Sequence, residues 1–381
     1  MKGSKNLNVP PLRFPEFTEE WKAEQLDNIA TLSKGIGISK EQLSEDGEPC
    51  ILYGELYTKY KSEIIKQVES KTDINGSKLK RSKANDVIIP CSGETAVDIA
   101  TARCVPFDNI LFGGDLNVIS LHQYDGAFMS YQLNGKRKYD IARVAQGVSI
   151  VHLYGEHLKA IKTYNPTLPE QQKIAKLLSL LDDRIDTQNK IIEDLKKLKS
   201  AISERLFKSV KGFTVLLSDL CDIVKGKQIN GENLSDSGNY YVMNGGTEPS
   251  GYYDNYNVEA STISISEGGN SCGYVQFNTS PFWSGGHCYS IQNIADKVDN
   301  MYLYHYLKSN EDAIMKLRIG SGLPNIQKKD LAMFKIIVPK IEWQIKISTF
   351  LSSLERKAEI EERIQNVMQK QKLYLLQQMF I

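Results

Sequence analysis

The sequence lacks several features that would assign a protein to a class at once. No apolar run approaches the roughly 18 to 20 residues that a membrane span requires, and no signal peptide opens the chain. The six cysteines show no C-x-x-C pair that would indicate a zinc site or a redox dithiol. These absences predict a cytoplasmic protein without a membrane segment, whose cysteines are buried free thiols.

Catalytic motifs are missing as well. The chain has no phosphate-binding loop, no H-E-x-x-H, no G-x-S-x-G and no G-x-G-x-x-G after a strand. Its five histidines show no spacing typical of metal ligands, so we expect neither a catalytic nor a metal site. Asn165-Pro-Thr-Leu168 is only superficially similar to the Asn-Pro-Pro-aromatic motif of adenine methyltransferases. An enzyme with its own methyltransferase site would need a doubly wound cofactor domain, for which the chain has no room.

Charge of either sign is nearly balanced along the chain. The 47 Lys and Arg residues and 46 Asp and Glu residues give a net charge of +1, and there is no basic tail. A length of 381 residues suffices for two globular domains with ordinary cores.

The sequence contains an internal repeat of one module. Residues 166–182 align without a gap with residues 339–355, and the first copy reads Pro-Thr-Leu-Pro-Glu-Gln-Gln-Lys-Ile at its start. Upstream, residues 26–35 align with 217–226, so each copy opens with an apolar segment that ends in Lys-Gly. The chain is therefore predicted to be two tandem copies of one unit.

Each copy ends in a long amphipathic helix. Thr167-Leu-Pro-Glu170 predicts a capping box with proline in the first turn. Apolar positions then step by threes and fours, as in a coiled-coil seam. A long helix is unstable alone in water, so we expect the two to pack together in opposite directions. The predicted seam consists of Ile174, Leu178, Leu181, Ile185, Ile192, Leu195, Ile202 and Leu206 in the first helix, and Ile347, Leu351, Leu354, Ile360, Ile364, Val367, Tyr374 and Leu375 in the second.

Short β-type runs separated by Gly, Pro, Asn and Asp fill both bodies that precede the helices. The predicted fold class is α+β: two tandem pseudo-symmetric α/β domains joined by two long antiparallel coiled-coil helices. The predicted domains span 1–165 and 210–338, and the predicted helices span 166–209 and 339–381.

The first body carries a local excess of positive charge. Eight basic side chains lie between Lys59 and Lys83 against three acidic ones, and Lys136-Arg137-Lys138-Tyr139 forms a second cluster. Cations interleaved with Tyr, Ser and Asn suit contacts with DNA phosphates and base edges. A solvated protein surface is the other interpretation of such a charge run.

The second body is net acidic, so its candidate binding elements are uncharged polar loops. These are Lys225-Gly-Lys-Gln-Ile-Asn230, Met243-Asn-Gly-Gly-Thr247 and Gly268-Gly-Asn-Ser271. Glycine permits close backbone approach, and amides supply a paired donor and acceptor. Hairpin turns on a sheet are the other interpretation of these loops.

The duplicated body and the repeated helix start Leu-Pro-Glu-Gln-Gln-Lys-Ile resemble the specificity subunits of type I restriction-modification systems. Trp21-Lys22, Gly251-Tyr-Tyr-Asp254 and Ser266-Glu-Gly-Gly-Asn270 support the resemblance, which covers essentially the whole chain. It implies that 1–165 and 210–338 are target-recognition domains that read the two halves of a bipartite DNA sequence, while the helices set the length of the spacer. Because the two bodies differ in nearly all loop residues, we expect an asymmetric target.

The resemblance also implies partners and their cofactors. Two modification subunits, which bind S-adenosylmethionine and methylate adenine, are expected on the helical regions, and two restriction subunits use ATP and Mg. The specificity subunit itself holds no cofactor and is not catalytic. The helix residues expected to contact the modification subunits are Ile174, Leu178, Leu181, Ile185, Ile347, Leu351 and Leu354.

The predicted partner of the two bodies is double-stranded DNA, with Arg81, Arg137, Gln228 and Asn270 as first choices for contact. The full set of predicted DNA-binding residues is Lys34, Lys59, Lys61, Lys78, Lys80, Arg81, Lys83, Lys136, Arg137 and Lys138 in the first body, and Lys225, Lys227, Gln228, Asn244, Asn270 and Ser271 in the second.

One departure from the family pattern concerns the second helix start. Ile341-Glu-Trp-Gln344 lacks the proline and the double glutamine of the first copy, so the two docking sites are expected to be unequal. An adaptor whose helix pair joins two binding domains without any DNA role is the alternative function. Binding that falls steeply with salt would favour the DNA interpretation over the adaptor.

Overall fold

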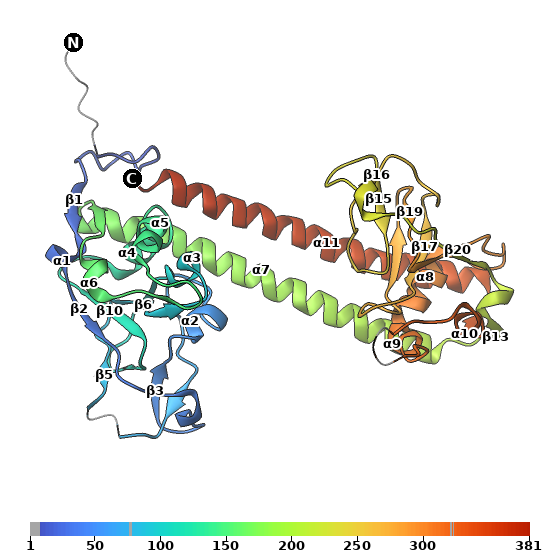
Figure 1. Cartoon of the computed structure of the whole chain (residues 1–381), viewed down its shortest axis with the longest axis horizontal. Coiled ribbons are helices and arrows are strands. Elements are labelled where there is room, and N and C mark those ends of the chain that lie inside the picture. The colour runs from blue at the N-terminus through green and yellow to red at the C-terminus, as the bar shows by residue number, and fades with distance from the viewer. Residues whose placement is uncertain (1–7, 76–77, 321, 323) are drawn as a thin grey trace, which may run out of the picture. The chain divides into compact units, whose positions relative to one another are not determined.

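The computed structural model describes residues 8–75, 78–320, 322 and 324–381, and it divides into two compact units (Figure 1). Unit 1 comprises Met1–Asn189 and Ile364–Ile381, and unit 2 comprises Lys190–Arg363. Each unit therefore contains one body and parts of both long helices. Within the described residues, no helix is both long and apolar enough to cross a membrane.

In unit 1 the main sheet has four antiparallel strands in the order β2-β10-β6-β8, and a smaller sheet has the order β4-β3-β9-β5 with β3 and β9 parallel. Two further pairs, β1 with β12 and β7 with β11, are antiparallel. The strands are β1 Lys22–Gln25, β2 Ala30–Lys34, β3 Glu48–Ile51, β4 Lys71–Thr72, β5 Lys80–Arg81, β6 Asp86–Pro90, β7 Ser92–Gly93, β8 Arg103–Val105, β9 Leu111–Phe112, β10 Leu116–Leu121, β11 Val151–His152 and β12 Lys162–Asn165. The short helices are α1 Leu26–Ile29, α2 Glu55–Thr58, α3 Ala96–Ile99, α4 Gly126–Asn134, α5 Lys138–Val144 and α6 Gly155–Lys159, with a 3-10 turn at Lys40–Gln42.

Unit 2 repeats this arrangement. Its main sheet has the antiparallel order β14-β20-β17-β18, and its smaller sheet β16-β15-β19 again contains one parallel pair, β15 with β19. The strands are β13 Phe213–Leu216, β14 Asp222–Lys225, β15 Tyr240–Met243, β16 Tyr252–Tyr253, β17 Thr262–Ser266, β18 Val275–Asn278, β19 Trp283–Ser284, β20 Cys288–Gln292 and β21 Lys335–Val338. The short helices are α8 Asn300–Ser309, α9 Glu311–Met315 and α10 Lys328–Ala332, with 3-10 turns at Leu217–Asp219 and Gly231–Asn233.

The equal strand orders confirm the predicted duplication and the α+β class. In each body an antiparallel pair, β1 with β12 or β13 with β21, joins its first and last strands. The central strands β6 and β17 are buried along their whole length, as expected for strands covered on both faces.

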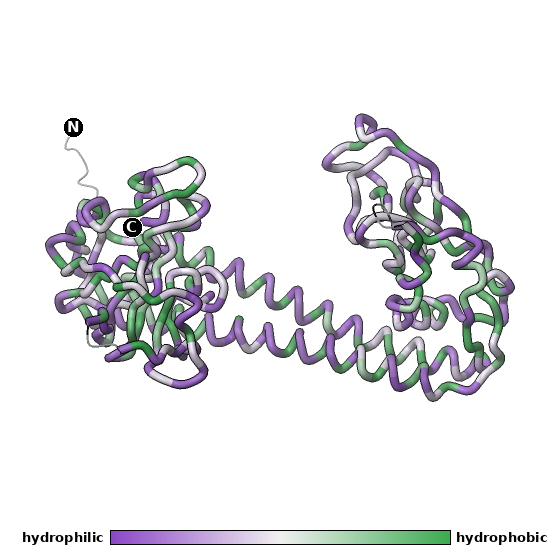
Figure 2. The backbone as a smooth tube through the Cα atoms, turned by 60° about the horizontal axis from the view of Figure 1, so that its bottom comes forward, coloured by the Kyte–Doolittle hydropathy of each residue, from purple (hydrophilic) through white to green (hydrophobic). Residues whose placement is uncertain are grey.

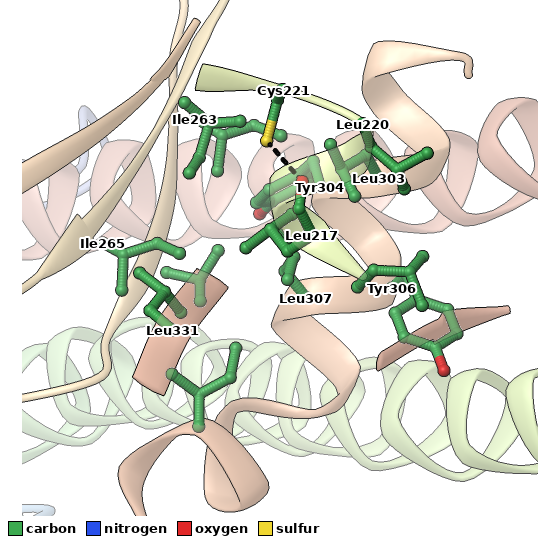
Figure 3. Packing of buried hydrophobic residues seen from close by; sticks show 14 of the residues in the cluster. Leu217, Leu220, Cys221, Ile263, Ile265, Leu303, Tyr304, Tyr306, Leu307 and Leu331 are labelled. Carbon is green, nitrogen blue, oxygen red and sulfur yellow. Dashed lines mark hydrogen bonds between the residues drawn. The ribbon is translucent and has the colours of Figure 1, made fainter. Parts of the chain in front are cut away.

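The core of unit 2 forms where α8 packs on the sheet. Figure 3 shows Leu303 and Leu307 of α8 among Ile263 and Ile265 of β17, and the Cys221 thiol donates to the Leu217 carbonyl oxygen at 3.3 Å. All six cysteines are buried free thiols, as predicted. Along the chain, apolar residues concentrate in the strands inside each body and alternate with polar ones in the long helices (Figure 2).

The long helices α7 (Leu168–Ser209) and α11 (Ile341–Gln378) pair in opposite directions within each unit. In unit 1, Asp182 contacts Lys372 and Asn189 contacts Gln365, and in unit 2 Lys199 contacts Glu355. In each of these three pairs the two residue numbers sum to 554. A constant sum means that the three pairs belong to the same antiparallel register. The ion pair of unit 2 repeats that of unit 1, because Glu355 aligns with Asp182 and Lys372 with Lys199 at the repeat spacing of 173 residues.

The predicted seam of α11 is wrong at four positions of its second half, whereas Leu375 is partly buried and packs against the core of unit 1. Ile360, Ile364, Val367 and Tyr374 are 39% to 65% exposed, whereas Gln365 and Lys372 face α7. The middle of the helix pair is joined through polar side chains, so the apolar periodicity there marks an outer stripe.

Candidate nucleic-acid interface

The Lys-Gly step that opens each copy lies against a glycine turn. A Cβ atom added to Gly35 would lie 1.9 Å from the Gly113 carbonyl oxygen, and one added to Gly226 would lie 2.2 Å from that of Gly285. No side chain fits at such distances, so glycine is required at both positions for close packing of two backbones.

Matching main-chain hydrogen bonds hold this contact in both units. Gly35 N donates to Leu116 O at 2.9 Å, and Gly226 N donates to Cys288 O at 2.9 Å. Residues 34–36 with the turn 112–115 in unit 1, and residues 225–227 with the turn 284–287 in unit 2, are called here the glycine cradles. The two cradles share one backbone design.

The unit 2 cradle brings together polar loops that the sequence presents separately. The Asn244 side-chain oxygen accepts from the His287 amide at 3.1 Å, and the Gln228 side chain lies against Gly286. The Ser266 hydroxyl donates to the Gly245 carbonyl at 2.6 Å. This bond joins the end of β17, just before Gly268, to the loop that contains Asn244. Lys225, Lys227, Gln228 and Asn244 thus meet at one place, and the exposed Asn270 and half-buried Ser271 follow on the adjoining loop.

A buried carboxylate gives this cradle its charge pattern. Glu267 accepts from Lys225 Nζ at 2.7 Å and from the Tyr289 hydroxyl at 3.1 Å, and its second oxygen is buried without a partner in the described part of the chain. Burial, followed by the Glu267 carboxylate, raises the pKa of Tyr289, so its hydroxyl remains a donor. The Lys225 charge is therefore largely compensated.

The unit 1 cradle differs at the matching position. Cys91 N donates to Asp115 O there, as Glu267 N donates to His287 O in unit 2. Burial raises the pKa of Cys91 to about 11, so the thiol is neutral beside Lys34. Lys34 lies over the Tyr154 ring at 5.7 Å, a cation–π contact that leaves its charge in place.

Part of the basic run lies next to the unit 1 cradle. Lys80 and Arg81 form β5, which pairs with Leu111–Phe112 directly before the cradle turn. The Arg81 guanidinium donates to both oxygens of Glu48, at 2.6 and 3.0 Å. Lys59 pairs with Glu55 at 2.7 Å, whereas Lys61, Lys78 and Lys83 are exposed.

The second basic cluster lies elsewhere in unit 1. Arg137 donates to the Ile381 carbonyl at 2.9 Å, pairs with Asp140 at 3.1 Å and lies over the Tyr164 ring. Lys136 is exposed and Lys138 half-buried. In Figure 1, α5, which begins at Lys138, lies at the end of unit 1 away from β3 and β5. The structure therefore does not bring the two basic clusters together, and DNA contact by Arg137 stays a prediction.

Comparison with known proteins identifies the family. The sequence model of the type I restriction modification DNA specificity domain matches twice, over residues 18–197 and 212–370. The chain belongs to this specificity family. The family match favours DNA recognition over the adaptor interpretation.

Individual relatives agree with the family match. A protein described as a type I specificity subunit in Mycoplasma genitalium is 34% identical over 122 residues, which are 32% of this chain and 31% of that protein. A similar protein of Mycoplasma pneumoniae is 32% identical over 38% of each chain, so both matches span well under half of those relatives. The specificity subunit of the type I restriction enzyme MjaVIII of Methanocaldococcus jannaschii is 24% identical over 98% of this chain and 95% of its own.

A solved structure shares the fold over nearly the whole chain. The crystal structure of a type I S subunit from M. genitalium superimposes with a TM-score of 0.69 at 20% identity, covering 98% of this chain and 99% of its own.

Within the described residues of the present specificity-family member, no group of three or more His, Cys, Asp or Glu side chains is arranged to hold a metal ion.

One glutamine anchors the start of each long helix in this family member. Gln171 accepts from the Asp125 amide at 2.9 Å and donates to Pro166 O at 2.8 Å. Gln344 makes the same bonds to the Asp299 amide and Pro339 O, both at 2.9 Å. Asp125 and Asp299 in turn cap α4 and α8. The second copy lacks the double glutamine, but it keeps the one that joins helix to body.

The predicted capping box at the first helix is replaced by a longer-range contact. Both Glu170 oxygens accept from Arg13 at 2.7 Å, and one also accepts from the Trp21 indole at 3.3 Å. Glu170 is fully buried, so it ties the segment before the first body to α7.

The residues predicted to contact modification subunits are mostly committed to the chain's own core. Ile174, Leu178 and Leu181 are buried in unit 1, and Ile347 and Leu351 in unit 2, because the first turns of each long helix pack under the adjoining body. Ile185 and Leu354 are half-buried. Large apolar side chains left exposed on the two helices include Leu177, Leu180, Ile191 and Leu198 on α7, and Trp343, Phe350, Ile360, Ile364, Val367 and Tyr374 on α11; Leu168, Ile341, Ile345 and Leu373 are exposed as well.

Proposed function

We propose that this specificity-family member reads a bipartite, asymmetric DNA target, with one half-site for each unit. The observation that carries the proposal is the pair of glycine cradles, which share main-chain bonds but present different side chains. The shared main-chain geometry suits two units that bind the same kind of ligand. The different side chains at matching positions, Cys91 in unit 1 and Glu267 in unit 2, suit recognition of two different base sequences.

In this proposal phosphate contacts position each unit and the loops beside each cradle read base edges. Exposed lysines such as Lys61 and Lys78 supply phosphate contacts, and the amides of Gln228, Asn244 and Asn270 have the donor and acceptor pairs that suit adenine in the major groove. Loss of a phosphate contact should weaken binding to all sequences alike, whereas loss of a base contact should cost about 1–3 kcal/mol at one position.

The long helices are proposed to set the spacer between the half-sites. Helices of 42 and 38 residues that pair in opposite directions within each unit have a definite length, which is what a ruler requires. Four residues inserted into α7 after Asn189, together with four into α11 after Ile364, preserve the pairing on either side and lengthen the pair by about 6 Å. We expect the preferred spacer to change by about one or two base pairs while both half-sites stay the same. An unchanged spacer would exclude the helices as the ruler.

Modification subunits are proposed to dock on the exposed apolar stripes of α7 and α11. Leu177, Leu180, Ile191 and Leu198 on α7, and Trp343, Phe350, Ile360, Ile364, Val367 and Tyr374 on α11, fall on a and d positions of one heptad in each helix, as in a seam that packs against another helix. Two modification subunits would supply S-adenosylmethionine and adenine methylation, and two restriction subunits would supply ATP- and Mg-dependent cleavage. The chain itself would be non-catalytic and would act on DNA in the cytoplasm.

The experiment that tests the function is to express the chain with its modification partner and map methylated adenines across the host DNA. We expect a two-part asymmetric motif with a fixed gap that depends on this chain. Absence of chain-dependent methylation in an assembled complex supplied with cofactor would contradict the proposal and favour the adaptor.

A further inference from the structure

The first turns of the two long helices carry one surface in two different states. On α7, Glu170 is buried under Arg13 and Trp21, and Lys173 is contacted by residues 14–17, although 46% of its side chain stays exposed. On α11, the aligned positions 343 and 346 are open. The repeat therefore provides both a covered and an uncovered form of the same site.

In unit 1 the covering segment makes aromatic and ionic contacts. The Lys173 ammonium pairs with Glu16 and lies 4.6 Å from the Phe14 ring centre and 5.9 Å from that of Phe17. Arg13 holds the same segment to Glu170. A lysine of α7 is thus met by a carboxylate flanked by two aromatic rings.

In unit 2 the same lysine is present, and no described residue outside α11 forms an ion pair or a cation–π contact with it. Lys346, which aligns with Lys173, lies 5.0 Å over the ring of Trp343. Trp343 is 58% exposed and Phe350, two turns further along the same face, is 47% exposed. A tryptophan and a phenylalanine open on one helix face beside a lysine form a surface that is unusual unless it has a partner.

We infer that Trp343, Lys346 and Phe350 bind a short extended segment of one modification subunit in which aromatic side chains flank a carboxylate. This inference rests on the proposed function. The chemistry of the segment is taken from Phe14, Glu16 and Phe17, which occupy the aligned surface of α7. Because Phe14, Glu16 and Phe17 already contact the lysine of the α7 surface, only one of the two modification subunits gains this contact, and the two bind with unequal affinity.

The test uses the full chain titrated with its modification partner and followed by native mass spectrometry, which resolves the first and second bound subunits. Trp343→Ser and Lys346→Glu should each weaken one binding step at least tenfold and leave the other unchanged. Val148→Ser is the control, because Val148 is an apolar side chain that is 97% exposed and belongs to unit 1, whereas the surface on α11 belongs to unit 2. Equal binding by all variants, or equal weakening of both steps, would overturn the inference.

A photo-crosslinking phenylalanine analogue at position 343 identifies the occupant directly. We expect a crosslink to a modification-subunit segment that contains aromatic and acidic residues. A crosslink to a second copy of this chain, or to a segment without those residues, would refute the inference. If the wild-type chain binds no modification subunit at all, the proposed function fails; if it binds two and the variants behave as wild type, only this inference fails.

Discussion

The same ion pair occurs in both units, but its surroundings differ. In unit 1, Lys372 of α11 contacts both Asp182 of α7 and Glu63 of the body, and the Tyr131 hydroxyl donates to Asp182. In unit 2, Lys199 pairs with Glu355, which also accepts from the Tyr304 hydroxyl at 3.0 Å, and among the described residues no second carboxylate pairs with Lys199. The side chains of Asp182 and Glu63 are under 10% exposed, whereas that of Glu355 is 26% exposed. Duplication has kept the positions of the charges, and each copy has since acquired its own degree of burial.

The strongest test of this difference is to remove the lysine from each pair. Lys372→Met leaves two buried carboxylates without a cation and should cost unit 1 about 3–5 kcal/mol. Lys199→Met leaves one partly exposed carboxylate and should cost unit 2 about 1 kcal/mol or less. Hydrogen exchange resolved by unit, under increasing urea, measures both. Equal losses would mean that burial does not distinguish the two pairs.

Acid should separate the two units further. His305 lies six residues after Asp299, the cap of α8, and corresponds to Tyr131, which lies six residues after the cap of α4. Burial lowers the pKa of His305 to about 4 despite the nearby Glu355. Between pH 6.5 and 4 the unfolded chain therefore binds a proton that the folded chain does not, so unit 2 loses up to about 1.4 kcal/mol per pH unit as the pH falls.

Unit 1 has the opposite tendency at its own pair. Burial raises the pKa of Asp182, so protonation on acidification favours the folded state there. The measurement is stability against pH for each unit, with His305→Gln as the control that should flatten the unit 2 profile. A profile that His305→Gln leaves unchanged would contradict the assignment.

The glycine cradles should respond alike. Gly35→Ala and Gly226→Ala each place a Cβ about 2 Å from a carbonyl oxygen, 1.9 Å in the first case and 2.2 Å in the second. Relief of either clash needs a backbone shift, so we expect a loss of about 1–3 kcal/mol in the unit that carries the substitution. Thermal unfolding of the two variants checks this, and a tolerated substitution in one unit only would show that the cradles are not equivalent.

The smallest expected difference concerns the two cradle lysines on DNA. Lys34 keeps its charge over Tyr154, whereas Lys225 is paired with Glu267. Lys34→Gln should reduce the slope of log affinity against log salt by about 0.9, and Lys225→Gln should reduce it by less. Binding to a duplex that carries both half-sites, measured at several salt concentrations, compares them. Equal changes would remove the distinction between a free and a compensated lysine.

Much of the architecture could be predicted from the sequence because it depends on repetition. The alignment of 166–182 with 339–355 identified both long helices, and that of 26–35 with 217–226 identified the duplicated bodies, because repetition is visible without knowledge of tertiary contacts. The outer stripe of α11 was misassigned for a physical reason: periodicity shows which residues share a helix face, but not which face turns inward. Ile360 and Ile364 have the spacing of a seam, yet Gln365 faces α7.

The candidate site was only partly predictable. Lys34 and Lys225 were identified because Lys-Gly is repeated, and the polar loops of unit 2 because of their composition. The cradle itself was missed, because Gly35 meets Gly113 only once β2 and β10 have paired. Glu267 was also missed, since its role depends on Lys225 and Tyr289, which lie on other strands.

The cradles bear on how such a protein changes over generations. The bonds that both cradles share are main-chain bonds beside glycines, and the side-chain bond from the His287 amide to Asn244 is added in unit 2. If the proposed function holds, substitutions in the loops around one cradle would alter one half of the recognised sequence and leave the other half unchanged. A lineage that carries this chain would then acquire new DNA targets one body at a time.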